Sequence, residues 1–304
     1  MVTGGAGFIG CHLIQKLLEK QEEVICLDNY CTGSKTNIYP FRNNPLFEVI
    51  RHDVVEPILL EVDRVWHLAC PASPIHYQSN PIKTSKISFL GTYNMLGLAK
   101  RVNAQFLMAS TSEIYGDPEV HPQPEFYKGS VNTFGIRACY DEGKRISETL
   151  CFDFNRIHDV DIRIARIFNT YGPKMLKNDG RVISNFIVNC LQGKSLEVNG
   201  DGNQTRSFCY VDDLVQGLIK LMDSKYNNPI NLGNPSEFTI KDLAYKVIKK
   251  IDHNIKLNFN PLPQDDPMRR RPNIDLAKRE LGWLPTIDID QGLDKTIKYF
   301  REII

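Results

Sequence analysis

The sequence contains no uninterrupted run of 18 or more apolar residues, which is the length that a membrane-spanning helix needs. It shows no secretory signal, because the apolar stretch at residues 2–9 is rich in glycine and has no basic lead. The eight cysteines show no Cys-X-X-Cys spacing, so they indicate neither a zinc site nor a disulfide framework. These absences favour a cytoplasmic protein with reduced thiols, no membrane partner and no metal.

An excess of charge of one sign is also missing. Lys and Arg number 37 against 36 Asp and Glu, which gives a formal net charge of +1. A balance this even provides no broad attraction to nucleic acid or to a membrane surface, and neither is expected as a partner. The 304 residues are 42% hydrophobic and 24% charged, values typical of a globular protein with one large domain or two closely joined ones.

Glycine is concentrated near the start of the chain. The segment GGAGFIG occupies residues 4–10 and leads into apolar residues at helical spacing, at positions 13, 14, 17 and 18. Gly4, Gly7 and Gly10 would let the backbone turn tightly and approach a pyrophosphate, while the helix N-terminus supplies free N–H groups. The glycines alone could close an ordinary turn, but the helix and the acid that ends the next strand favour a dinucleotide site.

Asp28 ends a short apolar strand 18 residues after Gly10, where a carboxylate would accept hydrogen bonds from an adenosine ribose. Asn29 and Tyr30 follow it, and no arginine is present to meet a 2′-phosphate, so NAD is predicted rather than NADP. Asp53 follows another apolar strand and could meet the adenine amino group, although a turn aspartate fits the pattern equally well.

The strand that normally precedes such a glycine loop is almost missing. Only Met1 and Val2 stand where it should be, so either this strand is very short or residues are absent upstream. Because missing partners in a central strand would lower stability, we expect an upstream truncation or a misassigned start.

Strand and helix patterns alternate through the first half of the chain. This alternation predicts an α/β fold, a Rossmann-type doubly wound parallel sheet with a smaller C-terminal α/β substrate-binding domain. Residues 1–170 are expected to form the NAD-binding domain, and residues 171–304 mainly the substrate domain, with segments returning to the sheet. The expected strands are 64–68, 105–109 and 161–167, and the expected helices are 87–102, 140–157, 181–191, 214–222 and 240–251.

Tyr140 and Lys144 form a Tyr-X-X-X-Lys motif on the helix expected at 140–157. Positions i and i+4 share one helix face, about 5–6 Å apart. A tyrosine is a poor base at neutral pH, but a neighbouring lysine and a positive nicotinamide ring favour its phenolate. The pair could then accept a proton from a substrate hydroxyl while hydride leaves to NAD. Alone the motif is more often a surface pair; behind a glycine loop it favours catalysis.

Hydroxyl and carboxyl side chains follow the strand expected at 105–109. Thr111, Ser112 and Glu113 lie where open α/β sheets place ligands, at the carboxyl end of a parallel strand. A turn rich in Ser and Thr is usually only a turn. The glutamate beside it is nevertheless a candidate acid or base.

Five segments together carry a family resemblance: GGAGFIG, TSEIYG, YDEGK, RIFNTYGP and RSFCYVDD. The chain resembles the extended short-chain dehydrogenase/reductases that act on nucleotide sugars, over essentially its whole length, and is most similar to the branch that decarboxylates UDP-glucuronate. Cys11, where serine is usual, and Lys174, where arginine is usual, depart from the pattern. Further support comes from segments 51–57, 67–74, 94–101, 179–182 and 265–267.

This resemblance implies a three-step reaction. Tyr140, aided by Lys144 and Thr111, would accept the C4 hydroxyl proton of UDP-glucuronate while hydride passes to NAD. The resulting β-keto acid loses CO2, and the enolate is protonated at C5. Return of the hydride at C4 gives UDP-xylose, so NAD would be tightly bound and regenerated in each cycle.

The resemblance also assigns residues to the two ligands. Glu113 would lie beside the substrate carboxylate with Ser112 nearby, and Arg206 would steer that carboxylate or stabilise the enolate. Lys86 and the run Arg269–Arg271 are further candidates to bind negative charge, although the run could equally be a solvated basic loop. The predicted cofactor-binding residues are Gly4, Gly7, Phe8, Ile9, Gly10, Asp28, Asn29, Thr32, Gly33, Asp53, Val54, Leu68, Ala109, Tyr140, Lys144, Thr170 and Arg181. The predicted substrate-binding residues are Lys86, Asn169, Arg181, Arg206 and Arg271.

Other activities share this scaffold. A 4,6-dehydratase carries an aspartate where this chain has Ser112, and a 4-epimerase has no need of a Glu113–Arg206 pair, so both are less favoured. An NAD-bound sensor or scaffold without activity would typically lose Tyr140 or Lys144. The resemblance further implies a homodimer through the helices near 87–102 and 140–157, although their apolar faces could equally pack internally.

Overall fold

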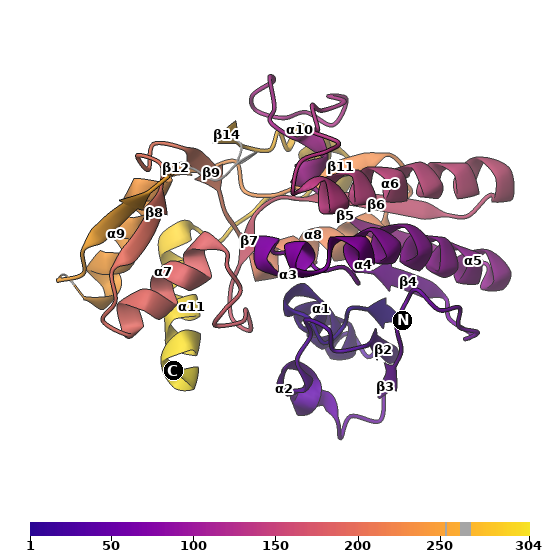
Figure 1. The fold of residues 1–304 in the computed structure, drawn as a ribbon. Coiled ribbons are helices and arrows are strands. Elements are labelled where there is room, and N and C mark those ends of the chain that lie inside the picture. The colour runs from indigo at the N-terminus through magenta and orange to yellow at the C-terminus, as the bar shows by residue number, and fades with distance from the viewer. Residues whose placement is uncertain (253, 262–268) are drawn as a thin grey trace.

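The computed structural model describes residues 1–252, 254–261 and 269–304 (Figure 1). The segment 265–267, which supported the family resemblance, lies outside the described residues. A seven-stranded parallel sheet forms the centre of the molecule, in the order β11-β6-β5-β4-β1-β2-β3. Its strands are β1 (Val2–Thr3), β2 (Val24–Asp28), β3 (Phe47–Arg51), β4 (Arg64–His67), β5 (Gln105–Thr111), β6 (Ile162–Ile167) and β11 (Pro229–Leu232).

Helices cover both faces of this sheet, so the predicted Rossmann-type doubly wound fold is confirmed. One apolar core contains Leu13 of α1 and Leu214 of α8. A second core contains Met95 of α5 and Cys151 of α6, on the other face of the sheet. The bounds are α1 (Phe8–Glu19), α2 (Lys35–Ile38), α3 (Pro74–Ser79), α4 (Pro81–Lys86), α5 (Thr92–Val102), α6 (Ala138–His158) and α8 (Val211–Asp223), with short turns η1 (Tyr39–Phe41), η2 (Ile87–Gly91) and η3 (Ser112–Tyr115).

The first strand is only two residues long, yet it holds the middle of the sheet. Val2 pairs with Cys26 of β2 on one side and with Trp66 of β4 on the other. The chain winds outward from β1 in both directions, and the crevice at such a reversal, outside the carboxyl ends of the strands, is where open α/β sheets bind ligands. The glycine loop begins at this point.

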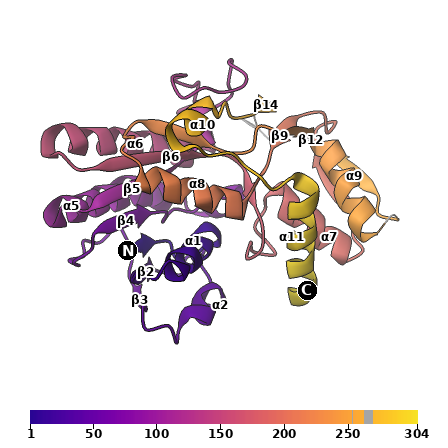
Figure 2. The same cartoon turned by 180° about the vertical axis from the view of Figure 1, so that it is seen from behind.

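Smaller sheets lie at the other end of the molecule. Both views place α7, α9 and α11 together there, away from β2 and β3 (Figures 1 and 2). The C-terminal part also supplies β11, which pairs with β6 at the edge of the main sheet. The remaining elements are β7 (Thr170–Tyr171), β8 (Leu196–Asn199), β9 (Thr205–Ser207), β10 (Cys209–Tyr210), β12 (Glu237–Thr239), β13 (Leu257–Asn260), β14 (Arg269–Arg270), α7 (Val182–Leu191), α9 (Ile240–Ile251), α10 (Asp275–Leu281) and α11 (Ile289–Ile303).

Two observations bear on membranes and metals. Of the helices in the described ranges, none combines the length and the apolar character needed to cross a membrane. Those same ranges contain no group of three or more His, Cys, Asp or Glu side chains placed to hold a metal ion. All eight cysteines are free thiols.

Candidate active site

Gly4 and Gly10 of the glycine loop are packed so tightly that residues with a side chain could not replace them. A Cβ at Gly10 would lie 2.3 Å from the carbonyl oxygen of Gly4, and one at Gly4 would lie 2.9 Å from the backbone of Ala69. Gly4 also has a positive φ of 68°, which favours glycine. Helix α1 begins after Gly7 with no side-chain cap and no acidic residue in its first turn. Its first N–H groups and its dipole therefore fit an anionic pyrophosphate.

Asp28 lies at the end of β2, beside this loop. Its carboxylate accepts hydrogen bonds from the backbone N–H groups of Ala6 at 3.0 Å and Tyr30 at 2.7 Å. Burial raises the pKa of Asp28, and these two hydrogen bonds oppose the rise. A Cβ at Gly33 would lie 3.0 Å from both carboxylate oxygens, so the close approach of that loop requires glycine. The carboxylate is thus fixed in place where a ribose hydroxyl would meet it.

Asp53 follows the end of β3, and two side chains bind its carboxylate. Asn29 donates a hydrogen bond to Asp53 at 2.9 Å, and the ammonium group of Lys83 lies 3.5 Å away. Burial would raise the pKa of Asp53, but the backbone N–H of Val55, Asn29 and Lys83 together lower it. Asp53 is therefore a fixed, ionised carboxylate at the edge of the crevice.

One elongated cavity runs from the glycine loop to the end of β5. Every residue predicted to bind the cofactor lines it, as do Thr111, Ser112, Glu113 and Asn169. Among the lining residues, Arg181 is tethered to Asp179, with Nη2 donating to a carboxylate oxygen at 2.7 Å, and its guanidinium lies 5.7 Å from the ring centroid of Phe8. The structure thus brings together in one cavity residues that are up to 177 positions apart in the chain, from Gly4 to Arg181.

Tyr140 and Lys144 lie on the same face of α6, as the motif predicts. The Lys144 ammonium lies 5.9 Å from the centroid of the Tyr140 ring and donates a hydrogen bond to the carbonyl oxygen of Ala109 at 2.7 Å. The Tyr140 ring stacks on Tyr77, with centroids 4.9 Å apart and planes 6° from parallel. These contacts fix the phenol at the carboxyl end of β5, next to Thr111.

Several influences act on the acidity of Tyr140. Burial raises the pKa of Tyr140 well above that of an exposed tyrosine, the thiol of Cys70 adds to the rise, and a hydrogen bond with Thr111 opposes it. Burial is thus the largest influence on the pKa of Tyr140, and the lowering expected from Lys144 together with a nicotinamide ring stays a prediction.

Glu113 lies in the turn η3 directly after β5, where the Thr111 hydroxyl accepts a hydrogen bond from its backbone N–H at 3.2 Å. Its carboxylate is clamped between two guanidinium groups, Arg137 at the start of α6 and Arg270 in β14. Burial alone would raise the pKa of Glu113, but Arg270 and Arg137 outweigh it and lower the value to about 2. Glu113 is therefore ionised and held by charge on both sides.

The resemblance places Arg206 with Glu113 at the substrate carboxylate, and this role stays a prediction. In the structure, Glu113 itself pairs with Arg270 and Arg137, and Arg206 does not line the cavity. Arg206 lies on β9 directly opposite Arg270 of β14, and its Nη1 donates to the carbonyl oxygen of Thr205 at 2.8 Å. β14 pairs with β9, and Arg270 of β14 reaches Glu113 in η3. The two strands lie too far apart in sequence for motif spacing to reveal this.

Two other predicted substrate contacts also fall outside the cavity lining. Lys86 is exposed at the end of α4, where its side chain faces solvent. Arg271 is half-buried, and its backbone N–H donates to the Gln123 side chain at 2.9 Å. The run Arg269–Arg271 is not a uniformly solvated loop, because Arg269 is exposed while Arg270 is 3% exposed.

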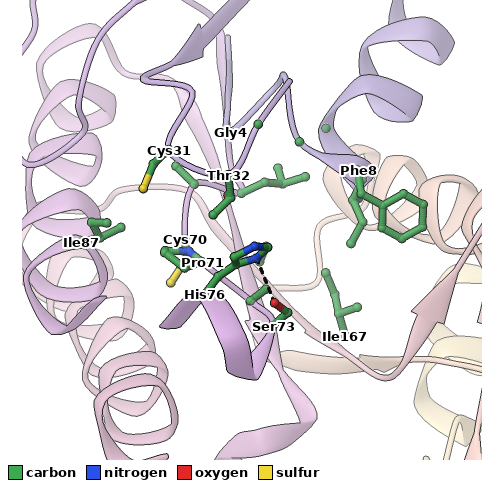
Figure 3. A pocket seen from close by; sticks show the side chains of 18 of the residues that line it. Gly4, Phe8, Cys31, Thr32, Cys70, Pro71, Ser73, His76, Ile87 and Ile167 are labelled. Atoms are coloured by element: carbon green, nitrogen blue, oxygen red, sulfur yellow. Dashed lines mark hydrogen bonds between the residues drawn. The ribbon is translucent and has the colours of Figure 1, made fainter. Parts of the chain in front are cut away.

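Sequence reasoning missed the loop that follows β4. Figure 3 shows Cys70, Pro71, Ser73 and His76 lining the cavity, with a hydrogen bond of 2.9 Å between the Ser73 hydroxyl and Nδ1 of His76. The available signal was their place at or beside segment 67–74, which follows a buried strand. Strand ends at the reversal point of the sheet are the positions to search for such contacts.

A doubly wound sheet, an uncapped glycine-rich helix start and a Tyr-X-X-X-Lys helix together define an extended short-chain dehydrogenase/reductase. A family model described as GDP-mannose 4,6 dehydratase matches residues 1–296, and the chain belongs to this family.

Similar proteins include UDP-glucuronic acid decarboxylase 4 of Arabidopsis thaliana, 57% identical over 302 residues, which are 99% of this chain and 68% of that protein. UDP-glucuronic acid decarboxylase 1 of Danio rerio is 55% identical over 304 residues, 100% of this chain and 73% of its own. Among solved structures, UDP-glucuronic acid 4-epimerase from Bacillus cereus, in complex with UDP-glucuronic acid and NAD, superposes with a TM-score of 0.91 at 27% identity, covering 100% of this chain and 99% of its own.

Proposed function

We propose that this chain converts UDP-glucuronate to UDP-xylose and CO2. The observation that carries this proposal is the 54–57% identity, over nearly the whole chain, to proteins named UDP-glucuronic acid decarboxylases. The geometry agrees with it, because a buried tyrosine that can exchange a proton and a carboxylate held by two arginines lie at the end of the same strand.

The residues around the glycine loop fit NAD as the cofactor. The uncapped start of α1 would hold the pyrophosphate, and Asp28 would hold the adenosine ribose. No arginine lies among the residues directly after Asp28 to favour a 2′-phosphate. When bound, NAD supplies a hydride acceptor for C4 and returns the hydride at the end of the cycle, so it would stay bound and be regenerated.

Tyr140 would exchange the proton of the C4 hydroxyl. Thr111 hydrogen-bonds to this phenol, which orients it toward a substrate seated at the end of β5. Lys144, fixed by the carbonyl oxygen of Ala109, keeps a positive charge beside the ring and favours the phenolate over what a neutral side chain would allow. These three side chains form the proton-transfer part of the site.

Arg270 and Glu113 would act on the carboxyl end of the sugar. Glu113 lines the cavity and Arg270 does not, so Arg270 would act on the substrate carboxylate through the Glu113 that it holds. Loss of CO2 leaves negative charge on the sugar, which a fixed guanidinium stabilises without reorganisation. Ser112, buried beside Glu113, would add a hydroxyl donor, while Asn169 and Arg181 would contact the nucleotide diphosphate.

We also propose that the chain divides into two domains. Residues 1–170 would bind NAD, and residues 171–304 would mainly hold the nucleotide sugar while returning β11 to the sheet. We place the protein in the cytoplasm on the basis of its free cysteines.

We further propose a homodimer through α5 and α6. Apolar side chains are exposed on these helices and on α4 beside them, with Ile82 75%, Tyr93 50% and Ile146 39% exposed. A second copy would bury these side chains. Sedimentation velocity measures the assembly directly, and a monomer at micromolar concentration would contradict the proposal.

A proton NMR time course with UDP-glucuronate and catalytic NAD tests the reaction. We expect the anomeric signal of UDP-xylose to replace that of the substrate without net formation of NADH. Folded, NAD-loaded protein that leaves UDP-glucuronate unchanged would contradict the proposal. The same sample then receives UDP-glucose and dTDP-glucose, because a product from either indicates an epimerase or a dehydratase.

A further inference from the structure

Asp141 is a buried acid that none of the steps above uses. It follows Tyr140 on α6 and is 7% exposed. Its Oδ1 is buried and has no hydrogen-bond partner within the described ranges, while its Oδ2 lies 3.9 Å from Nε of Arg137. A carboxylate that is removed from water and left with an unpaired oxygen is costly, so its presence calls for a physical account.

Arg137 connects this acid to the reaction centre. The guanidinium donates from Nη2 to Glu113, and its Nε faces Asp141 one helical turn further along α6. Arg270 holds Glu113 from the opposite side. Glu113 and Asp141 therefore share one guanidinium, and any change of charge on Asp141 alters how strongly Arg137 holds Glu113.

The surroundings of Asp141 place its change of charge in the neutral range. Burial, followed by the negative charge of Glu113, raises the pKa of Asp141 to about 7, and Arg137 and Arg270 oppose the rise. The charged and titratable groups that face it are Glu113 from η3, Arg270 from β14, Tyr77 from α3, and Arg137, Cys139 and Glu142 from α6 itself.

We propose that Asp141 is a positioning residue for the decarboxylation proposed above: when ionised, it draws Arg137 away from Glu113 and loosens the clamp on that carboxylate. When Asp141 is protonated, its attraction for Arg137 is lost and Arg137 holds Glu113 more tightly. Glu113 is then less free to adjust as charge develops on the substrate. Turnover should accordingly fall as the pH decreases through the neutral range.

The pH dependence of kcat for UDP-glucuronate tests this role. We expect kcat of the native protein to rise about tenfold from pH 6 to pH 8, as for one group titrating near 7. Asp141→Asn should be slow at every pH, below the native value even at pH 6, with an unchanged KM, because Asp141 does not line the cavity. Asp141→Glu should restore the inflection. Glu142→Gln, which removes the adjacent and more exposed acid, is the matched control and should keep the inflection, moved slightly to lower pH because Glu142 helps to raise the pKa of Asp141.

A native inflection that survives in Asp141→Asn overturns the proposal. It rests on the proposed function, so a second measurement that is independent of turnover separates the two. Glu113→Gln is made in the native protein and in the Asp141→Asn variant, and thermal unfolding is followed at pH 8 and pH 5.5. Because ionised Asp141 weakens the hold on Glu113, we expect Glu113→Gln to lower the Tm more in the Asp141→Asn variant at pH 8, and equally in both proteins at pH 5.5.

Equal effects at both pH values overturn the positioning role, whatever the activity. If the native protein fails to turn over UDP-glucuronate while the unfolding cycle shows this coupling, the proposed function is wrong and the link between Asp141 and Glu113 stands.

Discussion

The carboxylate of Glu113 and the guanidinium of Arg270 form a buried ion pair between side chains that are 157 residues apart in the chain. This contact joins the end of β5, where the proton-transfer residues lie, to β14 in the C-terminal part of the molecule. It holds in place a carboxylate that lines the candidate active site.

Arg270 should therefore be far more important than Arg206. Arg270→Lys keeps the charge but loses the guanidinium fork that holds Glu113, and we expect kcat for UDP-xylose formation to fall by about 10²-fold or more. Arg206→Lys, on the paired position of the neighbouring strand, is the matched control and should fall by much less. Both are measured in the NMR assay. Equal losses in the two variants would contradict the assignment of Arg270.

A Glu113 variant should slow decarboxylation more than it slows oxidation at C4. Glu113→Gln removes the negative charge between the two arginines while leaving Tyr140, Lys144 and Thr111 in place. We expect release of CO2 to slow more than formation of NADH in a single turnover, because oxidation at C4 uses the tyrosine part of the site. Stopped-flow absorbance at 340 nm and trapped CO2 measure the two steps. Parallel losses in both would count against this division of roles.

Tyr140→Phe should abolish turnover while preserving cofactor binding. The variant keeps the stacked ring beside Tyr77 but loses the hydroxyl that exchanges the proton, so kcat should fall by roughly 10²–10⁴-fold. NAD affinity, measured by isothermal titration calorimetry, should change little. Tyr93→Phe, at an exposed tyrosine on α5, is a control that should behave like the native protein. Native turnover in Tyr140→Phe would remove this residue from the mechanism.

The ion pairs of Glu113 should make stability sensitive to acid. Its pKa is about 2 in the folded protein, below the ordinary value of 4.5, so its contribution is fully present above about pH 5 and is lost as the pH falls toward 2. The shift corresponds to about 3 kcal/mol of unfolding free energy. Urea unfolding at pH 7 and pH 3 should therefore show a larger acid-induced loss in the native protein than in Glu113→Gln. Identical losses would mean that the clamp contributes nothing to stability.

Gly10→Ala should damage the cofactor site through packing alone. The new Cβ would lie 2.3 Å from the carbonyl oxygen of Gly4, so the loop must shift away from the start of α1. We expect NAD affinity to fall at least tenfold, because the backbone N–H groups would no longer converge on the pyrophosphate. Calorimetric titration with NAD measures the change. Unaltered affinity would show that the loop does not hold the pyrophosphate.

The sequence by itself determined those features that depend on short spacing. An i, i+4 pair such as Tyr140 and Lys144 shares a face of any α-helix, so its geometry follows from helix formation alone. The glycine loop, the helix after it and the acid at Asp28 lie within one strand-helix-strand unit, and their arrangement follows from that unit. Alternating strand and helix patterns likewise determined the doubly wound sheet.

Only the tertiary structure decided which distant charges meet. Arg270 rather than Arg206 reaches Glu113 because of how β14 lies against β9, and no local pattern encodes the pairing of strands that far apart. Lys86 is exposed to solvent, and burial raises the pKa of both Tyr140 and Asp141. The physical reason is the same in each case: the energy of a charge depends on the water and partners around it, and these are set by the packing of elements from the whole chain.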